Sequence, residues 1–200
     1  FVRDTVARLK LIDGRLNTRV ALASKVSKVQ HYLALNEIQP DIVEATALVL
    51  LLQAASPAFD SDKYLAAYQK YQAAMNEMLF QLRFRVEAAP AMSAVADIII
   101  RLMGNEKLSA SLSTGGHADA VIALSGSAQN KIVFSEYSTQ LRVNIQVTDE
   151  TGRRINTEEI VVAGGSMSSF DASTRTAANF LEQKLKDKGM FALLGMQNPK

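Results

Sequence analysis

The chain has 200 residues, which is enough for one large domain or two small ones with a buried core. Apolar residues make up 48% and charged residues 21% of the sequence, values typical of globular chains that exclude wholesale disorder. A net charge of +2 does not indicate a nucleic-acid partner, and the absence of cysteine excludes disulfides and thiolate chemistry.

The first part of the sequence predicts an antiparallel unit of three helices. Residues 1–35 carry one apolar stripe at helical spacing and form the first helix. The second, Ile42–Ala55, is apolar on nearly every face, so we expect it to be buried on several sides. The third runs from Asp60 to about Val86, and a heptad seam predicts that it packs against another helix. The seam consists of Tyr64, Tyr68, Tyr71, Met75, Met78 and Leu82.

The rest of the sequence predicts a small, mostly antiparallel sheet with flanking helices, so the expected fold class is α+β. A joint at residues 87–90 separates a helical unit, residues 1–86, from an α+β domain, residues 90–200. Helices are predicted at Met92–Met103 and Asp171–Lys188. Strands are predicted at Leu108–Leu112, Ala118–Leu124, Lys131–Tyr137 (alone or as the start of a ribbon to Val147) and Ile155–Ala163.

The clearest element is a hairpin over residues 137–164. Apolar residues from Leu141 to Val147 alternate with polar ones, and Asp149 to Gly152 supply a tight turn with glycine where φ is positive. The continuous apolar run at Ala118–Leu124 predicts a strand buried on both faces. Gly164-Gly165-Ser166 indicates a strand-to-helix turn, with a phosphate-binding loop as the alternative.

Only two histidines occur, His31 and His117. His117-Ala118-Asp119 places two metal-ligand types close together, but a pair of that kind more often marks a loop-to-strand junction. We therefore predict no metal site and no cofactor. A catalytic triad cannot be assigned from sequence order, and no catalytic residue is predicted.

The first predicted helix has a basic face that is the sequence's candidate interaction surface. It lacks the interleaved aromatic residues typical of nucleic-acid binding, so we predict a solvated face or contact with an acidic protein, and no nucleic acid. The residues assigned to this surface are Arg8, Arg15, Arg19, Lys25 and Lys28.

Residues 15–80 resemble the all-helical secreted chorismate mutases. The likeness is carried by Arg19-Val20-Ala21-Leu22-Ala23, by Asp60-Ser61-Asp62 and by Gln72-Ala73-Ala74. It implies ligand-binding roles for Arg19 and Gln72. Gln30 and Ile42 stand where that family has a catalytic lysine and a second arginine, so the fixed positive charge that would stabilise the transition state is missing.

Residues 90–190 resemble small bacterial envelope domains, namely the curli-secretion lipoprotein and the amino-terminal domain of the Tol translocation protein. The likeness rests on Ala118-Asp119-Ala120-Val121-Ile122, on the segment from Val143 to Gly152 and on the alanine-rich helix at 172–185. It implies a periplasmic or outer-membrane assembly role without catalytic residues.

Together these patterns favour a non-enzymatic interaction or assembly component of the bacterial cell envelope. Its partner would be another protein or a further copy of itself, bound by the basic face or by the edges of the sheet. The alternative is a chorismate-mutase-like enzyme or small-carboxylate binder in the helical half. No run of about 18 apolar residues predicts a membrane span, and a lipid anchor upstream of Phe1 would fit the envelope assignment.

Overall fold

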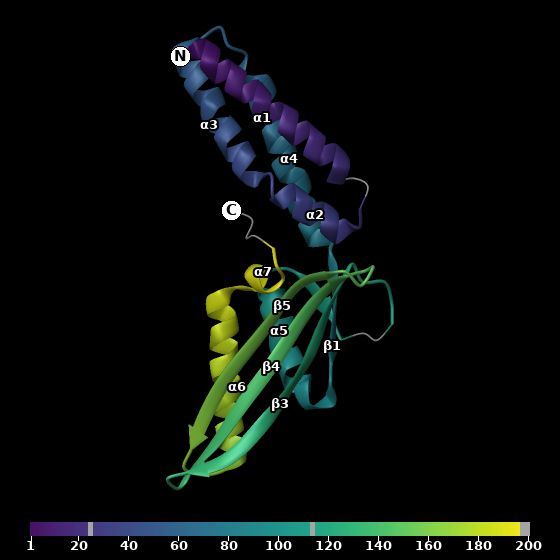
Figure 1. Cartoon of the computed structure of the whole chain (residues 1–200), viewed down its shortest axis with the longest axis vertical. Coiled ribbons are helices and arrows are strands. Elements are labelled where there is room, and N and C mark those ends of the chain that lie inside the picture. The colour runs from purple at the N-terminus through teal and green to yellow at the C-terminus, as the bar shows by residue number, and fades with distance from the viewer. Residues whose placement is uncertain (24–25, 113–114, 197–200) are drawn as a thin grey trace. The chain divides into compact units, whose positions relative to one another are not determined.

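A computed structural model of the chain describes residues 1–23, 26–112 and 115–196 (Figure 1). The chain divides into two compact units, Phe1–Gln81 and Leu82–Lys200, and each has its own hydrophobic core. The first unit is helical and the second is built on a five-stranded, mostly antiparallel sheet. The predicted α+β fold class is therefore confirmed.

The described residues of the helical unit form four helices where the sequence predicted three. They are α1 (Val2–Ala23), α2 (Lys28–Asn36), α3 (Gln39–Ala55) and α4 (Ser61–Gln81). The prediction of one helix over residues 1–35 was wrong because Ser27, with a ψ of 159°, is not helical. It caps α2 instead, its hydroxyl accepting a hydrogen bond from the Gln30 amide.

The core of this unit joins one face of α1 to α3 and α4. Tyr68 and Met75 are buried in it and Tyr64, Tyr71 and Met78 pack against it, so the predicted packing of the heptad seam is confirmed up to Met78. Leu82, the last residue of the predicted seam, lies beyond the end of α4. The prediction that α3 is buried on several sides was wrong, because Val43, Leu50 and Leu51 are more than half exposed. No single described helix meets the length and hydropathy of a membrane span, although α2 and α3, bent by 41°, do so when taken together.

The second unit begins with a strand in a place where the sequence predicted helix. Leu82, Phe84 and Val86 are buried and alternate with more exposed residues, which is the period of a strand and not of a heptad. Its remaining elements follow in chain order. They are β1 (Arg83–Ala88), the 3-10 helix η1 (Pro90–Met92), α5 (Ser93–Asn105), β2 (Ser109–Ser111), β3 (Ala120–Val133), β4 (Glu136–Asp149), β5 (Arg154–Ser166), α6 (Phe170–Lys188) and α7 (Met190–Leu193).

The sheet has the strand order β2-β1-β3-β4-β5. Strand β1 is parallel to β2 and β3, whereas β3, β4 and β5 form two antiparallel pairs. The predicted hairpin of β4 and β5 is confirmed, and Gly152 in its turn has a φ of 83°. The prediction of a strand over Lys131–Tyr137, alone or as the start of a ribbon to Val147, was wrong, because Phe134 and Ser135 have positive φ and form the turn between β3 and β4.

Helices α5 and α6 cover a single face of the sheet, as Figure 1 shows. Strand β3 is consequently buried on one face only: Ile122 is fully buried and Ala123 is exposed, which corrects the expectation of two buried faces. Gly164 lies within β5 and not in the predicted turn. A side chain at this position would meet the backbone of α6, because its Cβ would come within 2.2 Å of the Ala177 nitrogen.

A salt bridge fastens α5 to α6. The two terminal guanidinium nitrogens of Arg101 donate to the Glu182 carboxylate, at 2.9 and 2.7 Å. The ammonium nitrogen of Lys186, on the same helix as Glu182, lies 2.7 Å from this carboxylate. The hydrogen bonds from Arg101 and then from Lys186 lower the pKa of Glu182 from 4.5 to about 2.

This bridge predicts a pH-dependent contribution to stability. Because the pKa is lowered on folding, the stabilisation is present above pH 4.5 and is lost as the pH falls toward 2. Urea unfolding should find Glu182→Gln less stable than wild type at pH 7, with the difference closing near pH 2. Glu106→Gln, which makes the same change at an exposed glutamate, is the control. A difference that is constant across this pH range would contradict the assignment.

Candidate functional site

A groove runs along the outer edge of β5, between this strand and α6. Its main cavity has a volume of about 310 Å³, and a second cavity of about 190 Å³ continues it and shares Val161 and Lys184. The main cavity is lined by Val161, Val162, Ala163, Phe180, Gln183 and Lys184. The aromatic ring of Phe180 is 54% exposed, so a large apolar surface is available at the wall of the groove.

The strand beside this groove is the last one in the sheet, and among the described strands none pairs with its outer side. Exposed edges are normally protected by charged residues, proline or bulges. The stretch of β5 from Ile160 to Ser166 has no charged residue and no proline, and the register shift of the β4–β5 pair lies at its far end, at Val147/Thr148. This part of the edge is therefore suited to pairing with another strand.

Hydrogen bonding identifies which backbone groups point into the groove. The ammonium group of Lys184 donates to the carbonyl oxygen of Val161 at 3.0 Å. In an antiparallel pair, residues that bond to the partner strand alternate with residues that bond outward. The amides of Val161 and Ala163 consequently face the groove. The carbonyl oxygen of Val161, which Lys184 now occupies, is an acceptor that an added strand could use instead.

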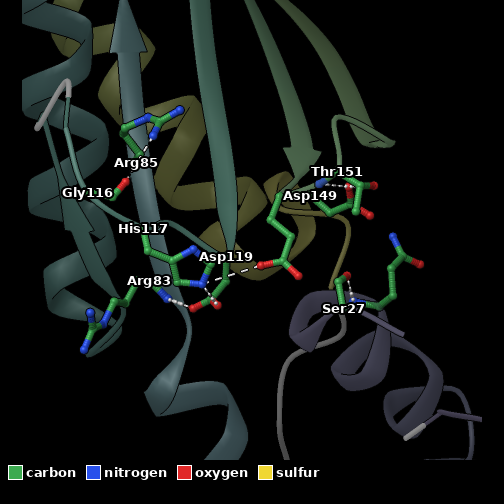
Figure 2. A network of polar contacts seen from close by, with 10 residues as sticks. Ser27, Arg83, Arg85, Gly116, His117, Asp119, Asp149 and Thr151 are labelled. Carbon is green, nitrogen blue, oxygen red and sulfur yellow. Dashed lines mark hydrogen bonds and ion pairs between the residues drawn. The ribbon is translucent and has the colours of Figure 1, made fainter. Parts of the chain in front are cut away.

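A polar cluster lies at the opposite end of the sheet from the β3–β4 turn, where β3 begins and β4 ends (Figure 2). Asp119 is 1% exposed, and its Oδ2 accepts a hydrogen bond of 2.9 Å from the backbone amide of Arg83. His117 Nε2 lies 3.4 Å from the other oxygen of Asp119, Oδ1, and 3.6 Å from Glu150 Oε2. This confirms that residues 117–119 form a loop-to-strand junction, and it adds a third potential ligand.

Asp149 organises the turn that carries Glu150. Its carboxylate is 2% exposed, and one oxygen accepts from the amide and the hydroxyl of Thr151, at 2.9 and 2.6 Å, and from the Arg153 amide at 3.0 Å. Three donors on one oxygen make the turn rigid, which fixes the place from which Glu150 extends toward His117.

The candidate ligand residues of the helical unit lie on different helices. Arg19 is exposed on α1 and Gln72 is half-buried on α4, and among the described residues no hydrogen bond or ion pair joins them. The break at Ser27 also ends the continuous first helix on which the likeness to chorismate mutases depended. Roles for Arg19 and Gln72 stay predictions.

Part of the predicted basic surface is neutralised within the unit. Arg8 pairs with Glu44, and Arg15 donates to Asp41 at 2.8 Å, so both are tied to α3. Lys28 begins α2, and Lys25 lies outside the described residues. The surface formed by Arg8, Arg15, Arg19, Lys25 and Lys28 stays a prediction as a contact site.

Sequence reasoning did not single out Phe180, Lys184 or Glu150, which the structure places in the two candidate sites. Phe180 and Lys184 were assigned to an ordinary amphipathic helix. Their place beside the edge of β5 depends on how the helix packs on the sheet, which the local sequence does not reveal. Glu150 was assigned to a turn, although the Asp149-Glu150 pair before Thr151-Gly152 was a signal of a carboxylate at the end of the hairpin.

No model of a known protein family matches the chain, and no curated protein matches it. Among solved structures, a minor lipoprotein from Acinetobacter baumannii is 12% identical, with a TM-score of 0.46 over 58% of this chain and 96% of that chain. An uncharacterized lipoprotein B from Nitrosomonas europaea is also 12% identical, with a TM-score of 0.38 over 57% of this chain and 86% of that one. Both TM-scores lie below 0.5, so neither likeness assigns a function.

Proposed function

We propose that the chain is a non-enzymatic binding component of the bacterial cell envelope that captures an extended segment of a partner protein as an added strand along β5. One observation carries this proposal: an edge of β5 that no described strand pairs with borders a groove walled by an exposed phenylalanine. Strand addition obtains affinity from main-chain hydrogen bonds and specificity from pockets for alternate side chains.

The groove offers both contributions. The backbone groups of Val161 and Ala163 would pair with the added strand, and Phe180 would be covered by one of its side chains. Fully burying an exposed phenylalanine contributes about 1.5 to 3 kcal/mol. Phe180 is 54% exposed, so covering it would contribute about half of this, which still makes it the expected energetic anchor. Lys184 would leave the Val161 carbonyl and could then meet an acidic residue of the partner.

The envelope location rests on the sequence resemblance of residues 90–190. The order of elements that this resemblance implies is present: helix α5, strand β3, the β4–β5 hairpin with its Thr151-Gly152 turn, and helix α6. A periplasmic or outer-membrane position, a lipid anchor upstream of Phe1 and self-assembly through the same edge all belong to the proposal.

Selection of peptides from a random displayed library tests strand addition directly. Selected peptides should bind wild type and lose at least tenfold in affinity for Ala163→Pro, because proline removes the outward amide and is tolerated on an edge strand. Phe180→Ala should lose a similar factor. Fluorescence anisotropy of labelled peptides measures both effects.

The matched control is Phe134→Ala, which removes the same side chain from the β3–β4 turn, where Phe134 is 99% exposed. This variant should bind the selected peptides as wild type does. The proposal fails if no peptide is enriched, or if the enriched peptides bind Ala163→Pro and Phe180→Ala unchanged. Light scattering separates capture of a partner from pairing between two copies of the chain.

A further inference from the structure

Three side chains converge at the entrance to β3 with the spacing of a metal-coordination sphere. One ligand atom each from His117, Asp119 and Glu150 lie within 4.8 Å of one another. In a tetrahedral site with metal–ligand distances of about 2.0 to 2.2 Å, neighbouring ligand atoms lie about 3.3 to 3.6 Å apart. The distances from His117 Nε2 to the two carboxylates, 3.4 and 3.6 Å, match this separation.

Groups outside the triad fix the carboxylate of Asp119 and the turn that carries Glu150. Asp119 is buried, and the Arg83 amide holds the oxygen that does not face His117. Glu150 follows Asp149, whose hydrogen bonds to Thr151 and Arg153 set the turn. Oriented ligand carboxylates of this kind are a regular feature of metal sites, because the supporting hydrogen bonds fix the direction of the lone pairs.

We propose that His117, Asp119 and Glu150 bind one Zn²⁺ ion at this end of the sheet. An imidazole nitrogen with two carboxylate oxygens suits Zn²⁺, whereas Ca²⁺ and Mg²⁺ prefer oxygen ligands alone. His117 is 63% exposed, so solvent reaches the site and a water molecule completes the coordination. The ion would join the loop before β3 to the β4–β5 turn, two segments that are distant in sequence.

The competing explanation is an ion pair without a metal, in which protonated His117 contacts the two carboxylates directly. In that case zinc would bind no more tightly to wild type than to a variant without the imidazole. The two explanations differ in one measurable quantity, the affinity for added zinc.

Isothermal titration of ZnCl₂ into untagged, chelator-treated chain tests the proposal. The background is low because the sequence has no cysteine and only two histidines. Wild type should bind one equivalent, and His117→Ala and Glu150→Gln should each bind at least about tenfold more weakly. His31→Ala is the matched control, since it removes the other histidine and should leave the affinity unchanged.

Thermal unfolding supplies a second readout that does not depend on the heat of binding. Zinc should raise the Tm of wild type and of His31→Ala, and should not raise that of His117→Ala. Both altered ligands are partly exposed, so these variants are expected to fold. The site is refuted if wild type shows no stoichiometric binding, or if His117→Ala and wild type bind zinc with equal affinity.

Discussion

Gly164→Ala is expected to destabilise the second unit by about 2 to 3 kcal/mol. The added methyl group would lie 2.2 Å from the Ala177 nitrogen and 2.3 Å from the Ser173 oxygen. Both are backbone atoms of α6, so relief requires moving the helix away from β5 and not merely turning a side chain. The same movement would open the groove, because α6 forms its wall.

Gly104→Ala is the matched control for this variant. A side chain at this position in α5 meets nothing within 4 Å, and alanine is a better helix former than glycine, so no loss of stability is expected. Hydrogen exchange of the β4 and β5 amides measures the opening free energy of this unit alone. Equal exchange in the two variants would show that α6 does not pack closely against β5.

Asp149→Ala is expected to cost about 3 kcal/mol in the same unit. One oxygen of its carboxylate accepts hydrogen bonds from the Thr151 amide, the Thr151 hydroxyl and the Arg153 amide. Alanine leaves these three donors without that acceptor. Hydrogen bonds to a charged group contribute about 1.5 to 3 kcal/mol each, and those to a shared oxygen are not fully additive.

Asp149→Asn should recover part of this loss, because an amide oxygen can still accept from the turn. Asp97→Ala, an exposed position on α5, should have an effect within about 0.5 kcal/mol of zero. Exchange of the amides flanking the β4–β5 turn distinguishes the three variants. An Asp149→Ala chain as stable as Asp97→Ala would show that the carboxylate does not organise the turn.

The β4–β5 hairpin could be predicted because every local signal agreed. The apolar alternation from Leu141 to Val147 and the Thr151-Gly152 turn both favour two strands with one buried face. The amphipathic pattern of α6 and its start near Asp171 were equally clear, and Ser169 caps this helix by accepting from the Ala172 amide.

The wrong predictions of secondary structure arose where the helical and the strand period both fit the same residues, or where the sequence marks the end of a helix only weakly. Leu82 continues the heptad seam of α4, which concealed the strand alternation that begins there. Residues 125–130 of β3 did not predict strand, because pairing with β4, and not burial, stabilises this exposed part of the strand. Among the described residues of this junction, the local sign that α1 and α2 are separate is Ser27, which caps α2.

The candidate sites were less accessible from the sequence than the fold. An edge could be expected to bind, but the choice of β5 depends on the strand order and on where Phe180 of α6 lies against it. The triad of His117, Asp119 and Glu150 depends on the pairing of Ala120 in β3 with Asp149 in β4. This pairing brings the residues just before β3 close to the residue just after β4. Tertiary register of this kind leaves no local pattern.

Amide exchange resolved by NMR, with and without a selected peptide, examines the binding edge residue by residue. If an added strand pairs with β5, the amides of Val161 and Ala163 exchange rapidly in the free chain and become strongly protected in the complex. Saturating peptide that leaves these two amides unprotected while slowing exchange elsewhere would contradict recognition at this edge.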